Sequence, residues 1–294
     1  MIEYDKHLWT SHLFDIQGSM VREILGRVSL CVFWASLVVA THQLTPMQLD
    51  MKPTIHTLVG VALGLLLVFR TNASYDRFWE GRKKWGAIVN ESRNLARGTR
   101  AYVSRDGLDL VGPILSWTAA FPYATMAALR PLPGFGEGAP IDRLPKDEVE
   151  GVLRSHHIPL AVAERISALL AEARDRGAIS DVVLAMLDNN VQLLVDYLGS
   201  CERIKNTPLP FVYVVHLRRA LIVYCFTLPF ALVADYGWWT ILVALLASYM
   251  FFGIDEIGVE IENPFDGDLN DLPLERFCET IARDVLALIP EAAA

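Results

Sequence analysis

The stretch Thr57-Leu-Val-Gly-Val-Ala-Leu-Gly-Leu-Leu-Leu-Val-Phe69 contains no charged residue and is the apolar run from which the fold can be worked out. Three similar runs cover residues 28–41, 220–234 and 238–254. Each run is shorter than the ~20 residues that span a hydrocarbon core. Each must therefore be extended by flanking helical residues, tilt, or be shielded from lipid by its neighbours. We predict four membrane helices, over about residues 24–42, 54–70, 217–235 and 237–256.

The composition agrees with a membrane protein. Of 294 residues, 53% are hydrophobic and 20% are charged, and the mean hydropathy is +0.32. This value is unusual for a soluble domain and also excludes a disordered chain. The 26 Lys and Arg against 34 Asp and Glu leave no basic patch for several phosphates, so we predict no nucleic-acid partner.

The remaining composition gives no sign of a cofactor or a targeting peptide. The four cysteines lie far apart, with no C-x-x-C pair, and we interpret them as reduced structural thiols. They are Cys31, Cys201, Cys225 and Cys278. The N-terminus carries carboxylates where a secretory signal would carry lysines, so no cleavable peptide is expected.

The positions of Lys and Arg beside the apolar runs predict the orientation in the membrane. Basic residues precede the first run, follow the second and begin the third, whereas the two intervening loops hold only Lys52. By the positive-inside rule both termini lie in the cytoplasm. The cytoplasmic part is then residues 71–212 and 257–294.

The cytoplasmic part also has helical periodicity. We predict helices over about residues 85–105, 113–129, 146–173 and 179–204, separated by a break at Asp106-Gly107 and by Pro131, Pro133 and the glycines near 136–138. No segment alternates as a strand would. The prediction is an all-α protein with one domain over residues 1–294.

One side of the second apolar run suits a pore. Val61, Leu65 and Phe69 recur every four residues and so lie on one stripe, beside the small residues Gly60 and Gly64. A ring of such helices, with the small face toward the neighbour, would make a narrow apolar constriction that closes by dewetting. Ordinary helix packing would explain the same spacing.

The residues after this run resemble the bestrophin family, particularly its short bacterial members. The family pattern Phe-Arg-x-x-x-Ser-Tyr-x-Arg-Phe-x-Glu-x-Arg-x-x-Trp-Gly is matched by Phe69, Arg70, Ser74, Tyr75, Arg77, Phe78, Glu80, Arg82, Trp85 and Gly86. Further matches lie in Leu13-Phe-Asp-Ile-Gln-Gly-Ser19, Ser180-Asp181, Leu187-Asp-Asn189, Cys201-Glu-Arg203, Thr207-Pro-Leu-Pro-Phe211, Leu228-Pro-Phe-Ala-Leu-Val233, Glu262-Asn-Pro-Phe265 and Asn270-Asp-Leu-Pro-Leu274. They cover nearly the whole chain in order.

The resemblance implies a homopentameric channel with a single axial pore. The hydrophobic neck of the family falls on Val61, Leu65 and Phe69, the stripe that spacing already indicates. The cytosolic aperture of the family follows the Ser-Asp pair, and so falls on Val182. A buried helix position would explain an apolar residue at Val182 equally well.

Eukaryotic bestrophins hold calcium in an unbroken acidic run after Asn-Pro-Phe. This chain has only Asp266, Asp268 and Asp271 there, interrupted by other residues, and the stretch does not fit an EF-hand. We predict a solvated acidic turn with weak or no calcium dependence, and no metal site.

The resemblance favours monovalent anions such as chloride, although bacterial members of the family are not uniform. The neck carries no charge, so it must select by width and dehydration. Arg70 would favour anions if it faced the axis, whereas Asp76 would not. A cation channel of the same architecture is the alternative.

Two other classes of function compete with a channel. A metal-dependent membrane enzyme could use the acidic residues near the fourth run, which are Asp255, Glu256, Glu260, Glu262 and Asp266. No His accompanies them, and His156-His157 reads as a surface turn. An alternating-access carrier would need inverted repeats, and the two halves show no internal similarity.

Overall fold

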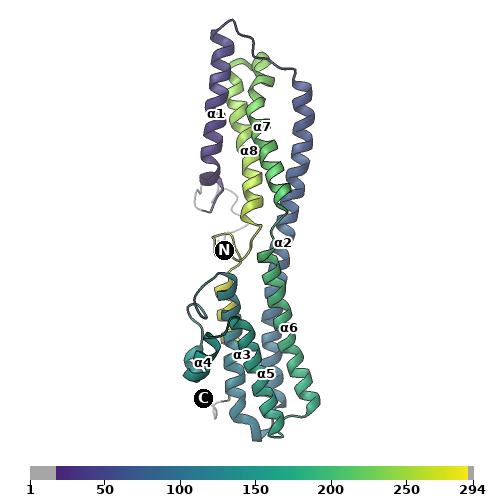
Figure 1. The fold of residues 1–294 in the computed structure, drawn as a ribbon, viewed down its shortest axis with the longest axis vertical. Helices are drawn as coiled ribbons and strands as arrows, with labels where there is room; N and C mark the ends of the chain where they lie inside the picture. The colour runs from purple at the N-terminus through teal and green to yellow at the C-terminus, as the bar shows by residue number, and fades with distance from the viewer. Residues whose placement is uncertain (1–17, 291–294) are drawn as a thin grey trace. The chain divides into compact units, whose positions relative to one another are not determined.

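The computed structural model describes residues 18–290, and within that range it contains helices and no strands (Figure 1). The all-α prediction is therefore confirmed for this part of the chain. The first five residues of the motif Leu13–Ser19 lie outside the described residues. The α-helices are α1 (Val21–Leu44), α2 (Pro53–Tyr102), α3 (Leu108–Leu129), α4 (Lys146–Leu153), α5 (Ile158–Asp175), α6 (Asp181–Asn206), α7 (Phe211–Tyr236), α8 (Thr240–Glu260) and α9 (Leu274–Leu286).

The described residues form two compact units. One comprises residues 18–78 and 208–263, and we call it the apolar-helix unit. The other comprises residues 79–207 and 264–290, and we call it the α3 unit. Helix α2 contributes its first half to the apolar-helix unit and its second half to the α3 unit.

The apolar-helix unit holds the segments that can cross a membrane. Helices long and apolar enough to do so occur within Val21–Leu44, Pro53–Tyr102 and Asp181–Glu260, and the third range includes α7 and α8. Helix α1 packs against α8 and α7, and α7 packs against α8. Ile24, Leu63, Leu221 and Phe252 are among the side chains buried between these helices. The count of four membrane helices stays a prediction.

The α3 unit is built around a single buried helix. Trp117 and Phe121 of α3 have no exposed surface, and almost every other residue of this helix is buried as well. Helices α5 and α9 pack against it. One face of α9 is buried, with Leu274, Cys278 and Ile281 on it, and most of the residues between them are polar.

Two boundaries and one helix differ from the predictions. Helix α2 is continuous through residues 70–85, where we expected two helices, because no proline lies there and Gly81 and Gly86 alone do not end it. The predicted helix 146–173 is divided into α4 and α5, because the His157 side chain accepts from the Leu160 N–H and Pro159 begins a new helix. No prediction covers α9, although Leu274, Cys278 and Ile281 have helical spacing.

Candidate pore-lining residues and the inner-end ion cluster

The predicted neck stripe is the side of α2 that its own protomer leaves uncovered. The side chains of Val61, Leu65 and Phe69 are 72%, 56% and 57% exposed, whereas Leu63 and Leu67 are buried. In a water-soluble helix the polar side would be the exposed one. Here a large apolar stripe has no packing partner within the described protomer, so only lipid, a neighbouring subunit or a pore axis can face it.

The small residues on α2 have different environments. A Cβ atom added at Gly60 would lie 2.7 Å from the Tyr224 hydroxyl oxygen of α7, so Gly60 is used for packing inside the protomer. A Cβ added at Gly64 would meet nothing within 4 Å. The expectation that both glycines face a neighbouring subunit is therefore wrong for Gly60, because α7 occupies that side of α2. It stays a prediction for Gly64.

Arg70 does not face a pore axis. Its side chain is 1% exposed, and its Nε lies 3.0 Å from Oδ1 of Asp255, which is 2% exposed. Its Nη2 lies 3.7 Å from Oε2 of Glu262. The idea that Arg70 attracts anions from the axis is therefore wrong, because two carboxylates of its own protomer neutralise it.

Other arginines continue this set of ion pairs, which we call the inner-end ion cluster. Arg27 of α1 lies 2.7 Å from Glu256, and Arg218 of α7 lies 3.9 Å from Asp255. The cluster therefore consists of Arg27, Arg70, Arg218, Asp255, Glu256 and Glu262. It joins the N-terminal parts of α1 and α7 and the C-terminal end of α8 to the middle of α2, at the level where the positive-inside rule predicts the cytoplasmic side.

The same ion pairs remove the basis for a metal-dependent enzyme. Asp255, Glu256 and Glu262 each pair with an arginine, and Glu262 also accepts from the Leu209 N–H at 2.9 Å. Within residues 18–290 no group of three His, Cys, Asp or Glu side chains could hold a metal ion. These carboxylates balance arginine charges rather than bind a divalent ion.

Val182, the predicted aperture residue, lies in the first turn of α6. Ser180 caps this helix by accepting from the Val183 N–H at 3.3 Å, and Val182 is 79% exposed. Leu187, further along α6, is fully buried, and its Cδ2 approaches Gly98 of α2 closely. Val182 is thus not buried within its own protomer, which leaves it available to an axial pore or to a neighbour.

The acidic turn is held together by one of its own carboxylates. Oδ2 of Asp271 accepts from the N–H groups of Gly267 and Asp268 at 2.7 and 2.9 Å. Burial raises the pKa of Asp271 above its usual value, although these two hydrogen bonds act in the opposite direction. The prediction of a solvated turn is correct for the exposed Asp266 and Asp268 and wrong for Asp271, which has a structural role.

The four cysteines are free and buried, as predicted. In the α3 unit, burial raises the pKa of Cys201 to about 12 and also raises the pKa of Cys278. Thiolates are the reactive form, so these two residues are unreactive near neutral pH.

Comparison with known proteins assigns the family. The model of a family described as bacterial/fungal bestrophin protein matches residues 1–287. The chain belongs to the bestrophin family. A voltage-dependent anion channel-forming protein of Nostoc sp. is 41% identical over 292 residues, covering 95% of this chain and 91% of the relative. A protein of the same description from Synechocystis sp. is 39% identical, covering 96% and 92%.

Solved structures of this family have the same fold. The crystal structure of a bacterial bestrophin homologue from Klebsiella pneumoniae is 31% identical to this bestrophin and superimposes with a TM-score of 0.81. The match covers 90% of this chain and 98% of that one. A point variant of the same homologue, also 31% identical, gives a TM-score of 0.83 over 91% of this chain and 99% of that one.

Sequence reasoning missed the partners of Arg70 in this bestrophin. A charged residue directly after a 13-residue apolar run needs a counter-charge, and Asp255 is the acidic residue that follows the fourth run at the matching end. Comparing the C-terminal ends of the second and fourth apolar runs would have suggested this ion pair. Sequence reasoning also missed Tyr213, whose hydroxyl donates to the Leu66 carbonyl oxygen at 2.7 Å and so fixes α7 against α2.

Proposed function

We propose that five copies of this chain form a channel with a single axial pore in the cell membrane, with both termini in the cytoplasm. Val61, Leu65 and Phe69 make its neck, and Val182 makes its cytosolic aperture. The observation that carries this proposal is the exposed apolar stripe on α2, which lies beside an Arg70 that is buried and paired with Asp255. Membership of the bestrophin family supports the same assignment.

The neck works by dehydration. It presents only aliphatic and aromatic groups, so a passing ion finds no polar replacement for its hydration shell. A narrow neck therefore excludes ions, and a slightly wider one that holds water lets them pass. Width sets whether the channel conducts, and charges outside the neck set which ions enter.

We also propose that the channel passes monovalent anions such as chloride. The support is the description of the Nostoc and Synechocystis relatives as voltage-dependent anion channel-forming proteins. One observation favours the cation alternative: Asp76 is exposed and follows Phe69 by seven residues, which returns it to the same side of α2. A ring of Asp76 carboxylates at the inner mouth would attract cations.

The protein is an ion channel of the bestrophin family rather than an enzyme. The matched relatives are channel-forming proteins, and the carboxylates on which a metal-dependent enzyme would depend are paired with arginines. No cofactor is part of the proposal.

Reversal potentials test the ion preference. Purified protein in a planar bilayer, with about tenfold more KCl on one side, gives a reversal potential near the chloride equilibrium potential if anions pass. A potential near that of potassium would overturn the anion assignment and favour the Asp76 alternative. Asp76→Asn then distinguishes the two further, because it shifts the potential only if this carboxylate faces the ion path.

Cross-linking and mass measurement test the assembly. In mild detergent, five copies give a particle of five times 32.8 kDa plus detergent, with a cross-linking ladder that ends at the fifth band. A protein that stays monomeric or dimeric under both measurements would overturn the pentamer.

A further inference from the structure

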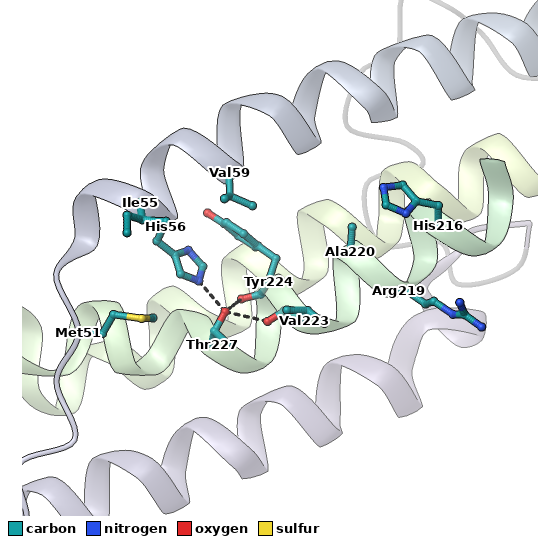
Figure 2. Close-up of a pocket in the computed structure, with 10 residues that line it drawn as sticks. All are labelled: Met51, Ile55, His56, Val59, His216, Arg219, Ala220, Val223, Tyr224 and Thr227. Carbon is teal, nitrogen blue, oxygen red and sulfur yellow. Dashed lines mark hydrogen bonds between the residues drawn. The ribbon is translucent and has the colours of Figure 1, made fainter. Parts of the chain in front are cut away.

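A groove outside the proposed ion path lies between α2 and α7, in the apolar-helix unit (Figure 2). Its volume of about 470 Å³ is within the range of roughly 300–1,000 Å³ that ligand pockets occupy. Aliphatic side chains make most of its walls, among them Ile55 and Val59 of α2 and Ala220 and Val223 of α7. We call it the α2–α7 groove.

Two basic residues border one end of the groove. His216 and Arg219 lie there, with the Arg219 guanidinium directed away from the His216 ring, whereas Met51 and the hydrogen-bonded pair of His56 and Thr227 form the other end (Figure 2). Arg219 has no carboxylate partner within residues 18–290, unlike its neighbour Arg218, which lies near Asp255. A cationic side chain on a membrane helix costs free energy unless it is paired or reaches a polar surface. Arg219 would therefore be stabilised by an anionic partner.

The length of the groove matches one leaflet of a bilayer. From His216 to Thr227 the groove follows eleven residues of α7, which is about 16 Å along a helix. Half of a ~30 Å hydrocarbon core is about the same. Arg219 falls near the start of the predicted membrane segment 217–235, so this end of the groove lies at the depth of lipid headgroups and the apolar walls lie at the depth of acyl chains.

We propose that the α2–α7 groove binds one acyl chain of an anionic phospholipid, whose phosphate pairs with Arg219. The walls accept the chain because almost all of the surface that it would cover is apolar. The phosphate accepts hydrogen bonds from the guanidinium of Arg219. These charge-assisted hydrogen bonds are stronger than hydrogen bonds between neutral groups. A zwitterionic lipid such as phosphatidylcholine fills the same walls, but its own ammonium group offsets the attraction between its phosphate and Arg219.

The test compares two lipids on the purified full-length protein. The protein is stripped with detergent, reloaded from vesicles of phosphatidylglycerol or phosphatidylcholine, and analysed by native mass spectrometry for lipids bound per protomer. The native protein should retain phosphatidylglycerol preferentially. Arg219→Gln should reduce that preference about fivefold, in line with the ~1 kcal/mol that one basic residue contributes near an anionic surface. Arg22→Gln is the matched control, because Arg22 is also exposed and has no partner in residues 18–290. It should leave the preference for phosphatidylglycerol unchanged.

A second pair of variants tests the walls. Ala220→Phe fills the groove and should reduce the retention of both lipids, while Ile222→Phe places the same ring on the outer side of α7 and should not. Val223→Phe repeats the filling at another wall position, in case Ala220→Phe does not fold. Equal retention of both lipids by the native protein, or full retention by the filled variants, would overturn the proposal. Filled variants that keep their lipid but lose cross-linked oligomers would assign the groove to a second copy of the chain, which would also overturn it.

Discussion

The Nε atom of Arg70 lies 3.0 Å from Oδ1 of Asp255, and both side chains are almost completely buried. Arg70 directly follows Phe69 of the proposed neck, so this ion pair fixes the rotation of α2 about its axis next to Phe69. Gly258 lets the pair form, because an added Cβ there would lie 3.2 Å from Nε of Arg70. The pair links the middle of α2, directly after the proposed neck residues, to α8.

Removing one member of this pair should destabilise the protein strongly. Arg70→Met leaves Asp255 buried without its main counter-charge, which costs about 3–5 kcal/mol in known cases. The double variant Arg70→Met with Asp255→Leu should regain most of that loss, because no buried charge is left alone. Thermal unfolding in detergent, followed by size-exclusion chromatography, measures the stability of the single and of the double variant. Arg27→Met, whose partner Glu256 is closer to solvent, is the control and should cost less. A double variant no more stable than the single one would contradict this account.

The ion pair of Arg70 and Asp255 also shows which structural features the sequence alone can predict. The spacing of Val61, Leu65 and Phe69 predicts a stripe on its own, because helical periodicity depends only on residues within one element. The partner of Arg70 lies 185 residues away, and no local pattern specifies which distant carboxylate reaches it. The structural role of Asp271 was missed for a related reason, since its backbone partners Gly267 and Asp268 depend on how the turn closes and not on composition.

The two glycines of α2 should respond differently to the same substitution. Gly60→Val places methyl groups where the Tyr224 hydroxyl lies, and overpacking of this kind costs about 1–3 kcal/mol. Gly64→Val meets open space in the protomer and should leave the unfolding temperature of the separated protomer unchanged. If Gly64 faces a neighbouring subunit, the same variant reduces the fraction of cross-linked oligomer. Equal loss of protomer stability in both variants would contradict this assignment.

The acidic turn should depend on Asp271 for its structure and on none of its carboxylates for calcium. Asp271→Ala leaves two N–H groups without an acceptor and should cost about 1–3 kcal/mol of unfolding free energy, whereas Asp266→Ala, in the same turn but exposed, should cost almost nothing. Current through the native channel should not change between calcium-free and micromolar calcium solutions. Steep calcium activation that disappears in Asp266→Asn with Asp268→Asn would show that the turn is a sensor.

Val182→Cys should react readily with thiol reagents. The position is mostly exposed on α6, while Cys201 is buried with a pKa of about 12 and gives little background near neutral pH. If Val182 lines the aperture, attaching a positively charged methanethiosulfonate raises anion current and a negatively charged one lowers it. Leu187→Cys, buried on the same helix, should stay unmodified until the protein is denatured. Modification of Val182→Cys without any effect on current would remove Val182 from the ion path.

The neck itself is tested by truncating its two largest side chains. Leu65→Ala and Phe69→Ala widen an apolar gap and let water fill it, so conductance or open probability should rise while the oligomer is retained. The cost in unfolding free energy should be below about 1 kcal/mol, because exposed side chains lose little packing, whereas buried Leu→Ala changes cost about 2–5 kcal/mol. Leu30→Ala and Phe33→Ala are matched controls, since both residues are similarly exposed but lie on α1, and they should leave the current unchanged. Single-channel recording and cross-linking decide the question together. Unchanged current in the neck variants, combined with loss of the oligomer, would mean that this stripe packs subunits together and does not line the pore.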